Sequence, residues 1–520
     1  MNEYIGITVG PVFSTMAMTN TPAALWAASY MFSYLTANIC EELSANGVLD
    51  EQFVSPAFSK GQQKLKNGVG QYHDRVIVRV QNGNPSLATV SKAVDAAKEK
   101  LSFILQTEMD TEEDIARLLL YINRYVRVVA FAFSAKEGEG AFAACQKQFD
   151  SAELYEPIPD PTDQNPLLRL FDSRGTDATH SSRNWLIRRS NLLKYEIDAE
   201  KWQLYENGML RTLESIGNGG EEETYLASGY CAILRSDGDN MGRMFERCHT
   251  DEDVRAFSAH CIHYCARISE KIGEYGGATI YAGGDDLLAI VPLLSMKKKK
   301  ENGRFASLFD LIYELKEISE TMLYRFCKEK GMLTEGKLTV SFGASVMPHE
   351  YPLQRTLEKS SDMLFRVAKG RWETKSSPKD RTAISFIGMD GRIDEFLMKN
   401  EAISQVLSFL DYLYENPEES SLIGYVIKKM MSGENIFLFA QKAGEKTLHQ
   451  VLKTAFAFNY RKKEAFYERL LTLLRAFAKP ETEAVVLDRT GEVLSDSSIG
   501  SFLAVFRAIY PMVNKVEVEE

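Results

Sequence analysis

Two short acidic segments of the sequence could do chemistry together. The first reads Ser-Asp-Gly-Asp-Asn-Met-Gly over residues 236–242, and the second reads Gly-Gly-Asp-Asp over residues 283–286. The carboxylates of Asp237, Asp285 and Asp286 would repel one another unless hard cations neutralised them, and Mg²⁺ or Mn²⁺ prefers such oxygen ligands. Two such ions, roughly 3.5–4 Å apart, can activate a 3′-hydroxyl and stabilise a leaving pyrophosphate. The two segments therefore predict metal-assisted phosphoryl transfer.

Glycines in both segments have a predicted role in shaping this site. Gly283 and Gly284 allow a tight turn and the close approach of a nucleotide. Gly238 and Gly242 flank a turn whose backbone N–H groups can cradle phosphates. Asp239 lies between them and has two equally open interpretations: it ligates metal, or it caps the turn that follows it.

The elements around the two segments decide whether they meet. A Gly-Gly-Asp-Asp segment alone is more often a polar hairpin turn, but here it follows Asp-Gly-Asp by about 45 residues. Hydrophobic periodicity predicts strands at 224–234, 278–282, 287–291, 337–347 and 382–387, and helices at 251–272, 304–330 and 353–371. This order, β-α-β-β-α-β with an added α-β unit, is that of a ferredoxin-like palm, whose first strand and hairpin are neighbours. The pattern therefore favours one shared acidic site over a simple turn.

The rest of the chain predicts further α and β elements. Strands at 4–9 and 75–80 alternate with helices at 23–43 and 89–108. Residues 110–216 are predicted to be mostly helical, with loop-rich or polar patches at 157–165 and 173–183, and the clearest linker is 217–223. Helical spacing dominates again from about residue 392. The predicted fold class is α+β.

Composition limits the compartment and the partners. The 520 residues include 61 Lys and Arg against 72 Asp and Glu, for a net charge of −11, which argues against indiscriminate binding to nucleic-acid phosphates. The seven cysteines form no Cys-x-x-Cys pair, as suits a reducing compartment. The charge-free stretch from Tyr4 to Cys40 is broken by glycines, prolines and asparagines, so we expect a buried strand and helix instead of a membrane span or signal peptide. A cytoplasmic protein without membrane association is predicted.

Both acidic segments, with their flanks, resemble the palm of the CRISPR polymerase. This family comprises the large subunits of type III CRISPR effector complexes, and the similarity is greatest to the Cmr-type (III-B) version. Residues 339–343 (Thr-Val-Ser-Phe-Gly) resemble the next palm strand, while Tyr351-Pro352-Leu353 and Ala368-Lys369 resemble the following helix and its phosphate-binding lysine. Near the N-terminus, Gly10-Pro11-Val12 and residues 25–30 resemble the opening of the family's first palm.

The resemblance implies two ferredoxin-like palm domains of the polymerase and nucleotidyl cyclase type, with a helical insert and a helical C-terminal domain. The implied boundaries are 1–135 for the first palm, 136–220 for the insert and linker, 221–390 for the second palm with its Gly-Gly-Asp-Asp site, and 391–520 for the C-terminal helices. The first palm is expected to be catalytically silent, because Gly10-Pro11-Val12 stands where the second palm has Ser236-Asp237-Gly238 and no carboxylate hairpin follows.

The resemblance also implies roles for individual residues. Asp237, Asp285 and Asp286 would be catalytic, and together with Gly238 they would hold Mg²⁺ or Mn²⁺. The expected nucleotide-binding residues are Asp239, Asn240, Met241, Gly242, Gly283, Gly284, Ser341 and Lys369. Ser341 could face an adenine base or simply point to solvent, and Lys369 would supply a positive charge to a triphosphate. Lys379 and Arg381 are weaker candidates for that task.

Two features depart from the family pattern, and two further features have a structural interpretation. Many relatives begin with an HD-type nuclease domain, and no DNase activity is expected here, because His73-Asp74 is interpreted as chance. Relatives often carry a four-cysteine zinc site in the insert, where only Cys145 lies here, so no zinc is expected. Cys261 and Cys265 fall on the apolar side of a predicted helix and are interpreted as core residues. The basic run at 297–300 is interpreted as a solvated loop, with an RNA contact as the minority alternative.

The implied function is a nucleotidyltransferase in an antiviral type III effector complex with guide crRNA and target RNA. It would make an adenine-based second messenger from ATP when target RNA is bound. The product would be a cyclic oligoadenylate or a conjugate of AMP with S-adenosylmethionine, and the sequence does not choose between these acceptors. Two alternatives stay open: a non-catalytic scaffold subunit, or a stand-alone cyclic-nucleotide synthase of the GGDEF type.

Overall fold

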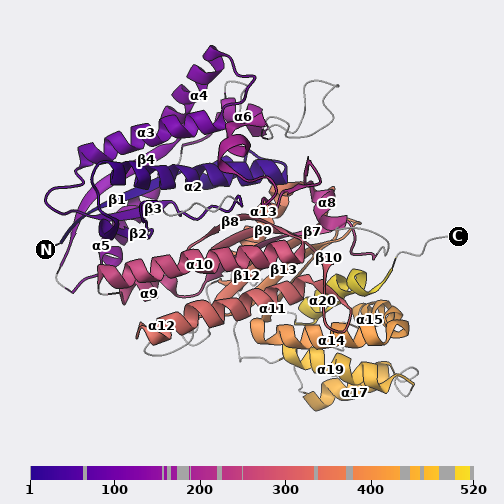
Figure 1. Ribbon diagram of the computed structural model, residues 1–520. Coiled ribbons are helices and arrows are strands. Elements are labelled where there is room, and N and C mark those ends of the chain that lie inside the picture. The colour runs from indigo at the N-terminus through magenta and orange to yellow at the C-terminus, as the bar shows by residue number, and fades with distance from the viewer. Residues whose placement is uncertain are drawn as a thin grey trace.

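A six-stranded mixed sheet forms the centre of the molecule (Figure 1). The computed structural model describes residues 2–61, 67–136, 138–154, 157–160, 165–171, 187, 189–218, 225–248, 250–332, 338–370, 379–433, 445–456, 462–478 and 498–515. The strand order is β14-β13-β12-β7-β9-β8. The strands are β7 (Tyr230–Gly238), β8 (Ala278–Gly283), β9 (Asp286–Pro292), β12 (Val340–Pro348), β13 (Arg381–Ile387) and β14 (Ile393–Lys399).

The register of this sheet brings the ends of distant strands together. β7 pairs antiparallel with β9 on one side and with β12 on the other, so β7 is a central strand. All of its residues are buried except Asp237, which is half-buried. A strand enclosed on both sides and both faces reads as a continuous apolar run, as Cys231 to Leu234 does. Its polar end, from Ser236 onward, therefore marks where the strand leaves the core.

Helices on one face of the central sheet lie between it and the N-terminal part of the chain. The longest is α10 (Asp251–Tyr275), which contacts β8 and also β2 of the second sheet. It begins where the Asp253 N–H donates to the Thr250 hydroxyl (3.1 Å) and ends at Gly276, whose φ of 96° closes the helix. The other helices that follow β7, β11 and β12 are α9 (Met241–Glu246), α11 (Leu308–Ser319), η3 (Glu320–Tyr324), α12 (Arg325–Glu329), α13 (Leu353–Ser361) and η4 (Asp362–Ala368).

The N-terminal part of the chain forms a second sheet of four antiparallel strands. Its order is β2-β3-β1-β4, and its strands are β1 (Asn2–Gly10), β2 (Phe53–Ser55), β3 (Arg75–Arg79) and β4 (Arg127–Ala135). The associated helices are α1 (Val12–Met16), α2 (Pro22–Ala45), η1 (Asp50–Gln52), α3 (Leu87–Leu105), α4 (Glu112–Tyr125) and α5 (Ala141–Glu153). Residues 21–40 are all buried, because α2 packs on α3 and on β8 of the central sheet.

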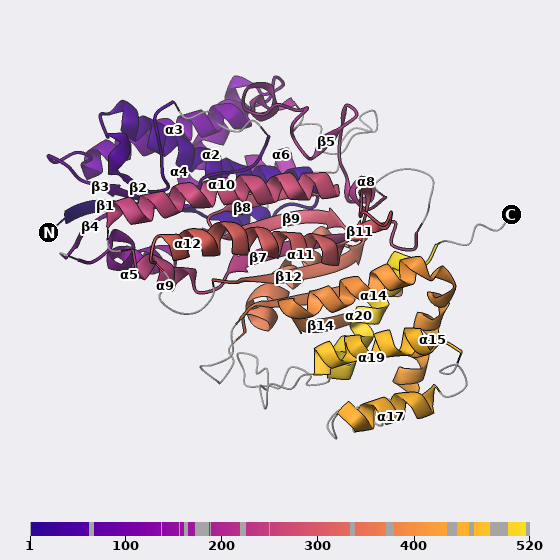
Figure 2. The ribbon, with the colours of Figure 1, turned by 60° about the horizontal axis from the view of Figure 1, so that its bottom comes forward.

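Shorter elements and a group of helices complete the described chain. Between the two sheets in sequence lie α6 (Pro166–Phe171), η2 (Leu192–Glu196), β5 (Tyr205–Glu206), β6 (Met209–Leu210) and α8 (Leu213–Asn218). The C-terminal helices are η5 (Asn400–Ala402), α14 (Ile403–Glu415), η6 (Pro417–Glu419), α15 (Ser421–Ser432), α17 (Glu445–Ala455), α19 (Glu464–Ala478) and α20 (Ser498–Val513). Figure 2 shows α14, α15, α17 and α19 grouped beside the central sheet, where α20 packs against β14.

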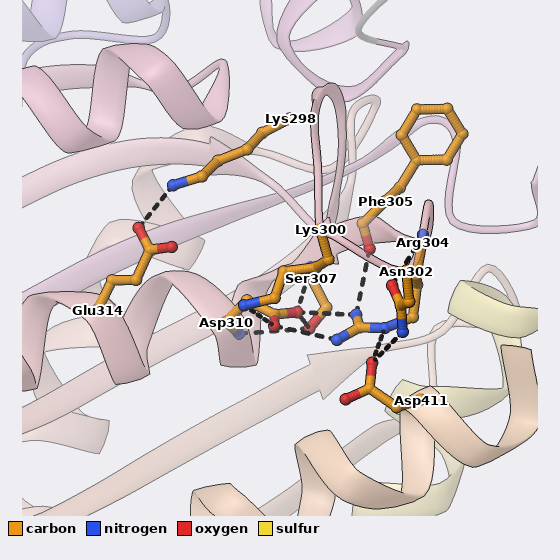
Figure 3. A network of polar contacts seen from close by, with 9 residues as sticks. All are labelled: Lys298, Lys300, Asn302, Arg304, Phe305, Ser307, Asp310, Glu314 and Asp411. Carbon is orange, nitrogen blue, oxygen red and sulfur yellow. Dashed lines mark hydrogen bonds and ion pairs between the residues drawn. The ribbon is translucent and has the colours of Figure 1, made fainter.

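A buried ionic network joins the central part of the chain to α14 (Figure 3). It starts at the hairpin of β10 (Leu294–Lys299) and β11 (Phe305–Ser307), where Arg304 donates to both carboxylate oxygens of Asp310 at 2.8 and 3.0 Å. The same guanidinium donates to Asp411 on α14 (2.8 Å). Burial opposes ionisation of Asp310, but the hydrogen bonds from Arg304 hold the pKa of Asp310 below its usual value. The hairpin, α11 and α14 are thereby fixed to one another.

The structure agrees with many predicted elements and corrects others. The predicted strands at 4–9, 75–80 and 382–387 and the predicted helices at 23–43 and 89–108 agree with β1, β3, β13, α2 and α3 within a few residues. The helix predicted over 304–330 is wrong at its start, where β11 stands, and β10 was not predicted. The helical predictions for 110–216 and for the chain after 392 miss β4 and β14. The patch at 173–183 and linker residues 219–223 lie outside the described residues. Among the described residues, no helix is long and apolar enough to cross a membrane.

Candidate active site

The three predicted aspartates meet at one end of the central sheet. Asp237 is the penultimate residue of β7, Asp285 lies in the turn between β8 and β9, and Asp286 opens β9. Each offers a carboxylate oxygen, and the three oxygens lie within 4.8 Å of one another. The pairing of β7 with β9, which places Ser236 opposite Leu287, is what brings them together. Clustered carboxylates are a donor set that suits Mg²⁺ or Mn²⁺.

Glycine is needed at two positions where the backbone comes close to other atoms. The Gly238 N–H donates to Asp285 Oδ2 (3.1 Å), and a Cβ at residue 238 would lie 2.7 Å from that oxygen. A Cβ at Gly283 would lie 2.4 Å from the hydroxyl of Tyr281. Gly284 adopts φ +68°, which a side chain disfavours. The sequence prediction that Gly283 and Gly284 form a tight turn is confirmed.

Lys369 follows η4 and enters the acidic cluster. Its ammonium makes an ion pair with Asp237, donates to the Gly238 carbonyl (2.8 Å) and lies 3.6 Å from Asp239 Oδ1. Its side chain is only 8% exposed, so this ammonium is the charge closest to Asp237 among the residues that the structure describes. A cation at this point shows that the Asp237 carboxylate and the Gly238 carbonyl can face one positive charge together.

Asp239 is placed differently from both sequence interpretations. It is fully buried and accepts hydrogen bonds from the hydroxyls of Thr339 and Ser341 (each 2.9 Å) and from the Asp380 N–H (2.9 Å). With these partners it neither joins the three-carboxylate cluster nor caps α9, whose N-cap is Asn240. Asp239 instead ties β7 to β12 and to the segment before β13.

The remaining predicted nucleotide contacts lie around this turn. Ser341 is fully buried and bonded to Asp239, so its hydroxyl does not face the acidic cluster directly. Asn240 has the left-handed φ of 65°, and Met241 and Gly242 open α9. No atom lies within 4 Å of a Cβ built on Gly242, so its surroundings are open. Met241 is buried, as is Arg381, the first residue of β13.

Crowding of the carboxylates raises their proton affinity. Burial and the charges of Asp286 and Asp237 raise the pKa of Asp285 well above its usual range, although Lys369 opposes this. The Asp286 side chain is exposed at the surface, but the protein atoms around it partly desolvate its carboxylate. This desolvation and the charge of Asp237 raise the pKa of Asp286 to about 7. Carboxylates in this state gain from a bound cation, because the cation favours their charged form.

A cavity of about 140 Å³ opens beside Asp286, between the N-terminal helices α1 and α2 and the central sheet. The helix α1 and the segment before β3 supply Phe13 and Asp74, while β7 and η4 supply Arg235 and Phe365. The two phenylalanine rings are 64% and 43% exposed. Sequence reasoning missed all four residues, because only the packing of the N-terminal part of the chain on the central sheet, through α2, brings them together.

Two other sequence features find their partners in the structure. His73 contacts the Ser55 hydroxyl (3.1 Å), and burial lowers the pKa of His73 to about 4. Asp74 lines the cavity instead, so the two side chains have different surroundings. The lysines at 297, 298 and 300 make ion pairs with Glu206, Glu314 and Asp310, and Lys299 lies over the Phe305 ring. The basic run is therefore neutralised within the chain, which disfavours the RNA-contact alternative. Cys261 and Cys265 are buried in the apolar core.

The comparison with known families concerns the segment that holds this site. Residues 230–382 match the sequence model of the domain described as Cas10/Cmr2, second palm domain. This segment is a Cas10/Cmr2-type second palm domain. The matched segment runs from β7 into β13 and contains the three aspartates and Lys369. The part of the chain that resembles this palm domain is therefore the part that carries the acidic cluster.

Two solved structures extend the similarity in fold beyond this domain. The CRISPR system Cmr subunit Cmr2 of Pyrococcus furiosus is 26% identical over 226 residues, covering 38% of this chain and 22% of that protein. The alignment thus spans about a fifth of the relative's length. A chain of a type III-B Cmr-beta complex in its apo state has TM-score 0.58 at 10% identity, over 98% of this chain and 82% of that one. A chain of a Csm1–Csm4 cassette in complex with cA3 has TM-score 0.51 at 14% identity, over 98% and 69%. At these identities the two structures show a shared fold.

Proposed function

We propose that this chain is the nucleotidyltransferase subunit of a type III CRISPR effector complex and makes an adenine-based second messenger from ATP. The observation that carries the proposal is the cluster of Asp237, Asp285 and Asp286, whose carboxylate oxygens lie within 4.8 Å of one another. A solved relative with the same fold is named as a complex with cA3, a product of this class. The activity is proposed to depend on target RNA held by guide crRNA and partner subunits.

The chain's own residues divide the work around the reacting groups. Asp237, Asp285 and Asp286, with the Gly238 carbonyl, would hold two Mg²⁺ ions, which supply hydroxyl activation and charge neutralisation when bound. Lys369 already faces Asp237 and the Gly238 carbonyl, so bound cations would compete with its ammonium and free it for a triphosphate. Asp239 would keep Lys369 within reach of that triphosphate.

The cavity beside Asp286 is the proposed place for the acceptor. Its exposed rings, Phe13 and Phe365, offer faces on which an adenine can stack. Its charged groups are Asp74, Asp286 and the buried Arg235. With Asp286 holding metal, Asp74 is the carboxylate that a triphosphate placed there would meet, whereas the amino and sulfonium groups of S-adenosylmethionine would be attracted by it. These charges favour the S-adenosylmethionine–AMP conjugate, and a cyclic oligoadenylate is the competing product.

Product analysis of the reconstituted complex tests both parts of the proposal. Radiolabelled ATP and Mg²⁺ are incubated with and without matching target RNA and with and without S-adenosylmethionine. The Asp285→Ala, Asp286→Ala double variant should make no product. Glu301→Ala, which removes an exposed carboxylate in the turn before β11, should match the native chain.

The outcomes separate the competing functions. Target-dependent product that requires S-adenosylmethionine identifies the conjugate, and product from ATP alone identifies an oligoadenylate. Full activity of the isolated chain without RNA would favour a stand-alone synthase. A complex that binds target RNA but makes no product under any condition would leave the scaffold function.

A further inference from the structure

The outer edge of β4 is open in the part of the chain that the structure describes. β4 is nine residues long, from Arg127 to Ala135, and pairs along its whole length with β1. It stands last in the order β2-β3-β1-β4, so its other side has no strand partner. Its eight residues after Arg127 carry no charge, no glycine and no proline. A long, regular, apolar edge of this kind is a ready template for another strand.

The backbone groups that face this edge follow from the register. The Val9 N–H donates to the carbonyl of Asp74 beside β3 (2.9 Å), so the odd-numbered residues of β1 turn their polar groups toward β3. The even-numbered residues of β1 turn toward β4, where Gly6 pairs with Phe131. The odd-numbered residues of β4 are therefore bonded to β1, and its even-numbered residues point outward. These outward residues are Val128, Ala130, Ala132 and Ser134.

The other edges of the two large sheets are protected. β2 has three residues, an irregular register and α10 packed against it. β8 is irregular between Thr279 and Tyr281 and is covered by α2. β14 carries Asp394 and Glu395 and is covered by α20. Short strands, irregularities, charges and covering helices are the devices that prevent edge pairing. Among the described residues, the helices α3 and α5 contact β4, but β4 is long, regular in register and uncharged after Arg127, so it lacks the other three devices.

Charges at the two ends of β4 indicate what would pair with it. Arg124 and Arg127 lie at its start and Lys136 at its end, and none of the three has a carboxylate partner among the described residues. Two β4 strands paired symmetrically from two copies would bring Arg127 of each copy toward Lys136 of the other, which is unfavourable. Beside the start of β4, Leu154 is 85% exposed at the end of α5. An apolar strand with acidic ends would satisfy the backbone groups, the apolar surface and the charges.

We propose that β4 binds an extended segment of another protein, which adds a fifth strand to the N-terminal sheet and carries acidic residues at both ends of an apolar centre. Backbone hydrogen bonds to the four outward residues would provide affinity, and the flanking cations would select the partner. This interface is independent of the proposed catalytic activity, because β4 contributes no residue to the acidic cluster or its cavity.

The test uses the full-length chain and a fluorescein-labelled peptide, Glu-Val-Thr-Val-Thr-Val-Thr-Val-Glu, in a fluorescence anisotropy titration. The Ala132→Pro variant removes one outward N–H that has no acceptor among the described residues, and an edge strand tolerates proline there. Ala132→Ser is the matched control, because it keeps the N–H and nearly the same size. We expect Ala132→Pro to weaken peptide binding by about tenfold or more, and Ala132→Ser to bind like the native chain.

Three results would overturn the proposal. The first is that Ala132→Pro binds the peptide as tightly as the native chain does. If Ala132→Pro does not fold, Ser134→Pro is measured in its place, and equal binding by that variant counts in the same way. The second is equal binding of a peptide with lysine at both ends, which would remove the role of the cations. The third is a dimer of the chain, seen by analytical ultracentrifugation, that Ala132→Pro abolishes, which would make a second copy the partner. The proposal would be established if Ala132→Pro weakens binding of the acidic peptide and the native chain binds that peptide more tightly than the lysine-ended one. Lys136→Glu should then bind the lysine-ended peptide more tightly than the acidic one.

Discussion

Replacement of Gly238 by alanine would test whether the position of Asp285 controls turnover. The new Cβ would lie 2.7 Å from Asp285 Oδ2 and 2.6 Å from Met241 Cγ, whereas ordinary contacts begin at 3.4 Å. To relieve the first contact, the carboxylate must move by about 0.7 Å, and its hydrogen bond from the residue 238 N–H must lengthen. Misplacement of a reacting group by about 1 Å can cost about 100-fold in rate, so we expect turnover to fall by about 10- to 100-fold.

The assay compares initial rates of product formation by reconstituted complexes under saturating ATP and Mg²⁺, with Mn²⁺ affinity measured by calorimetry. Gly424→Ala, in α15, is the matched control. Its Cβ would lie 3.6 Å from the side chain of Tyr510, which is an ordinary contact. That variant should keep the native rate. Gly238→Ala should keep its melting temperature within a few degrees, because Gly238 has no positive φ and α9 can adjust.

Two results would refute this reasoning. A Gly238→Ala complex that works within twofold of the native rate would show that the carboxylate position tolerates the shift. A loss of activity that accompanies a large fall in melting temperature would show that the substitution acts on the fold and not on Asp285.

Three further predictions concern charge. Asp239→Asn should lower the free energy of unfolding, measured in urea, by about 1–3 kcal/mol. The reason is that a buried side chain that accepts from two hydroxyls and one N–H becomes partly a donor. A change below about 0.5 kcal/mol would contradict this. The pKa of Asp286 is raised to about 7, so the metal-free fold loses stability as pH rises from about 4 through 7. Bound Mg²⁺ favours the charged carboxylates, so Mg²⁺ should raise the melting temperature more at pH 8 than at pH 6. An equal rise at both pH values would argue against the metal site. Arg304→Ala should cost about 3–5 kcal/mol because it leaves Asp310 buried without its main partner, whereas Lys298→Ala should cost less than about 1 kcal/mol, and similar losses in both would contradict the network.

The acidic cluster could be predicted because its information is local. The segment Asp-Gly-Asp at a strand end and the segment Gly-Gly-Asp-Asp in a hairpin each predict a local geometry from consecutive residues. The pairing of the two strands then brings their carboxylates together. The helix α10 was equally readable, because its apolar residues recur at helical spacing between Thr250 and Gly276. These elements carry their periodicity and their caps in consecutive residues.

What the sequence did not reveal depends on contacts between distant segments. Asp239 looks like a metal ligand until Thr339, 100 residues away, donates its hydroxyl to it. Asp74 faces the cavity only because the N-terminal part of the chain packs on the central sheet through α2. The run Val-Val-Ala-Phe-Ala-Phe of β4 is apolar throughout, and such a short run does not distinguish a strand from a buried helix.

The packing of α2 on β8 has a consequence for how the chain is made. Residues 21–40 are buried on every side, partly against a strand that begins at residue 278. At about 5–20 residues per second, roughly 10–50 s of synthesis separate the emergence of α2 from that of β8. For that interval a helix whose residues 22–40 carry no charge has no complete covering, so the nascent chain needs shelter from aggregation. For the same reason, the N-terminal half expressed without β8 should accumulate as insoluble protein.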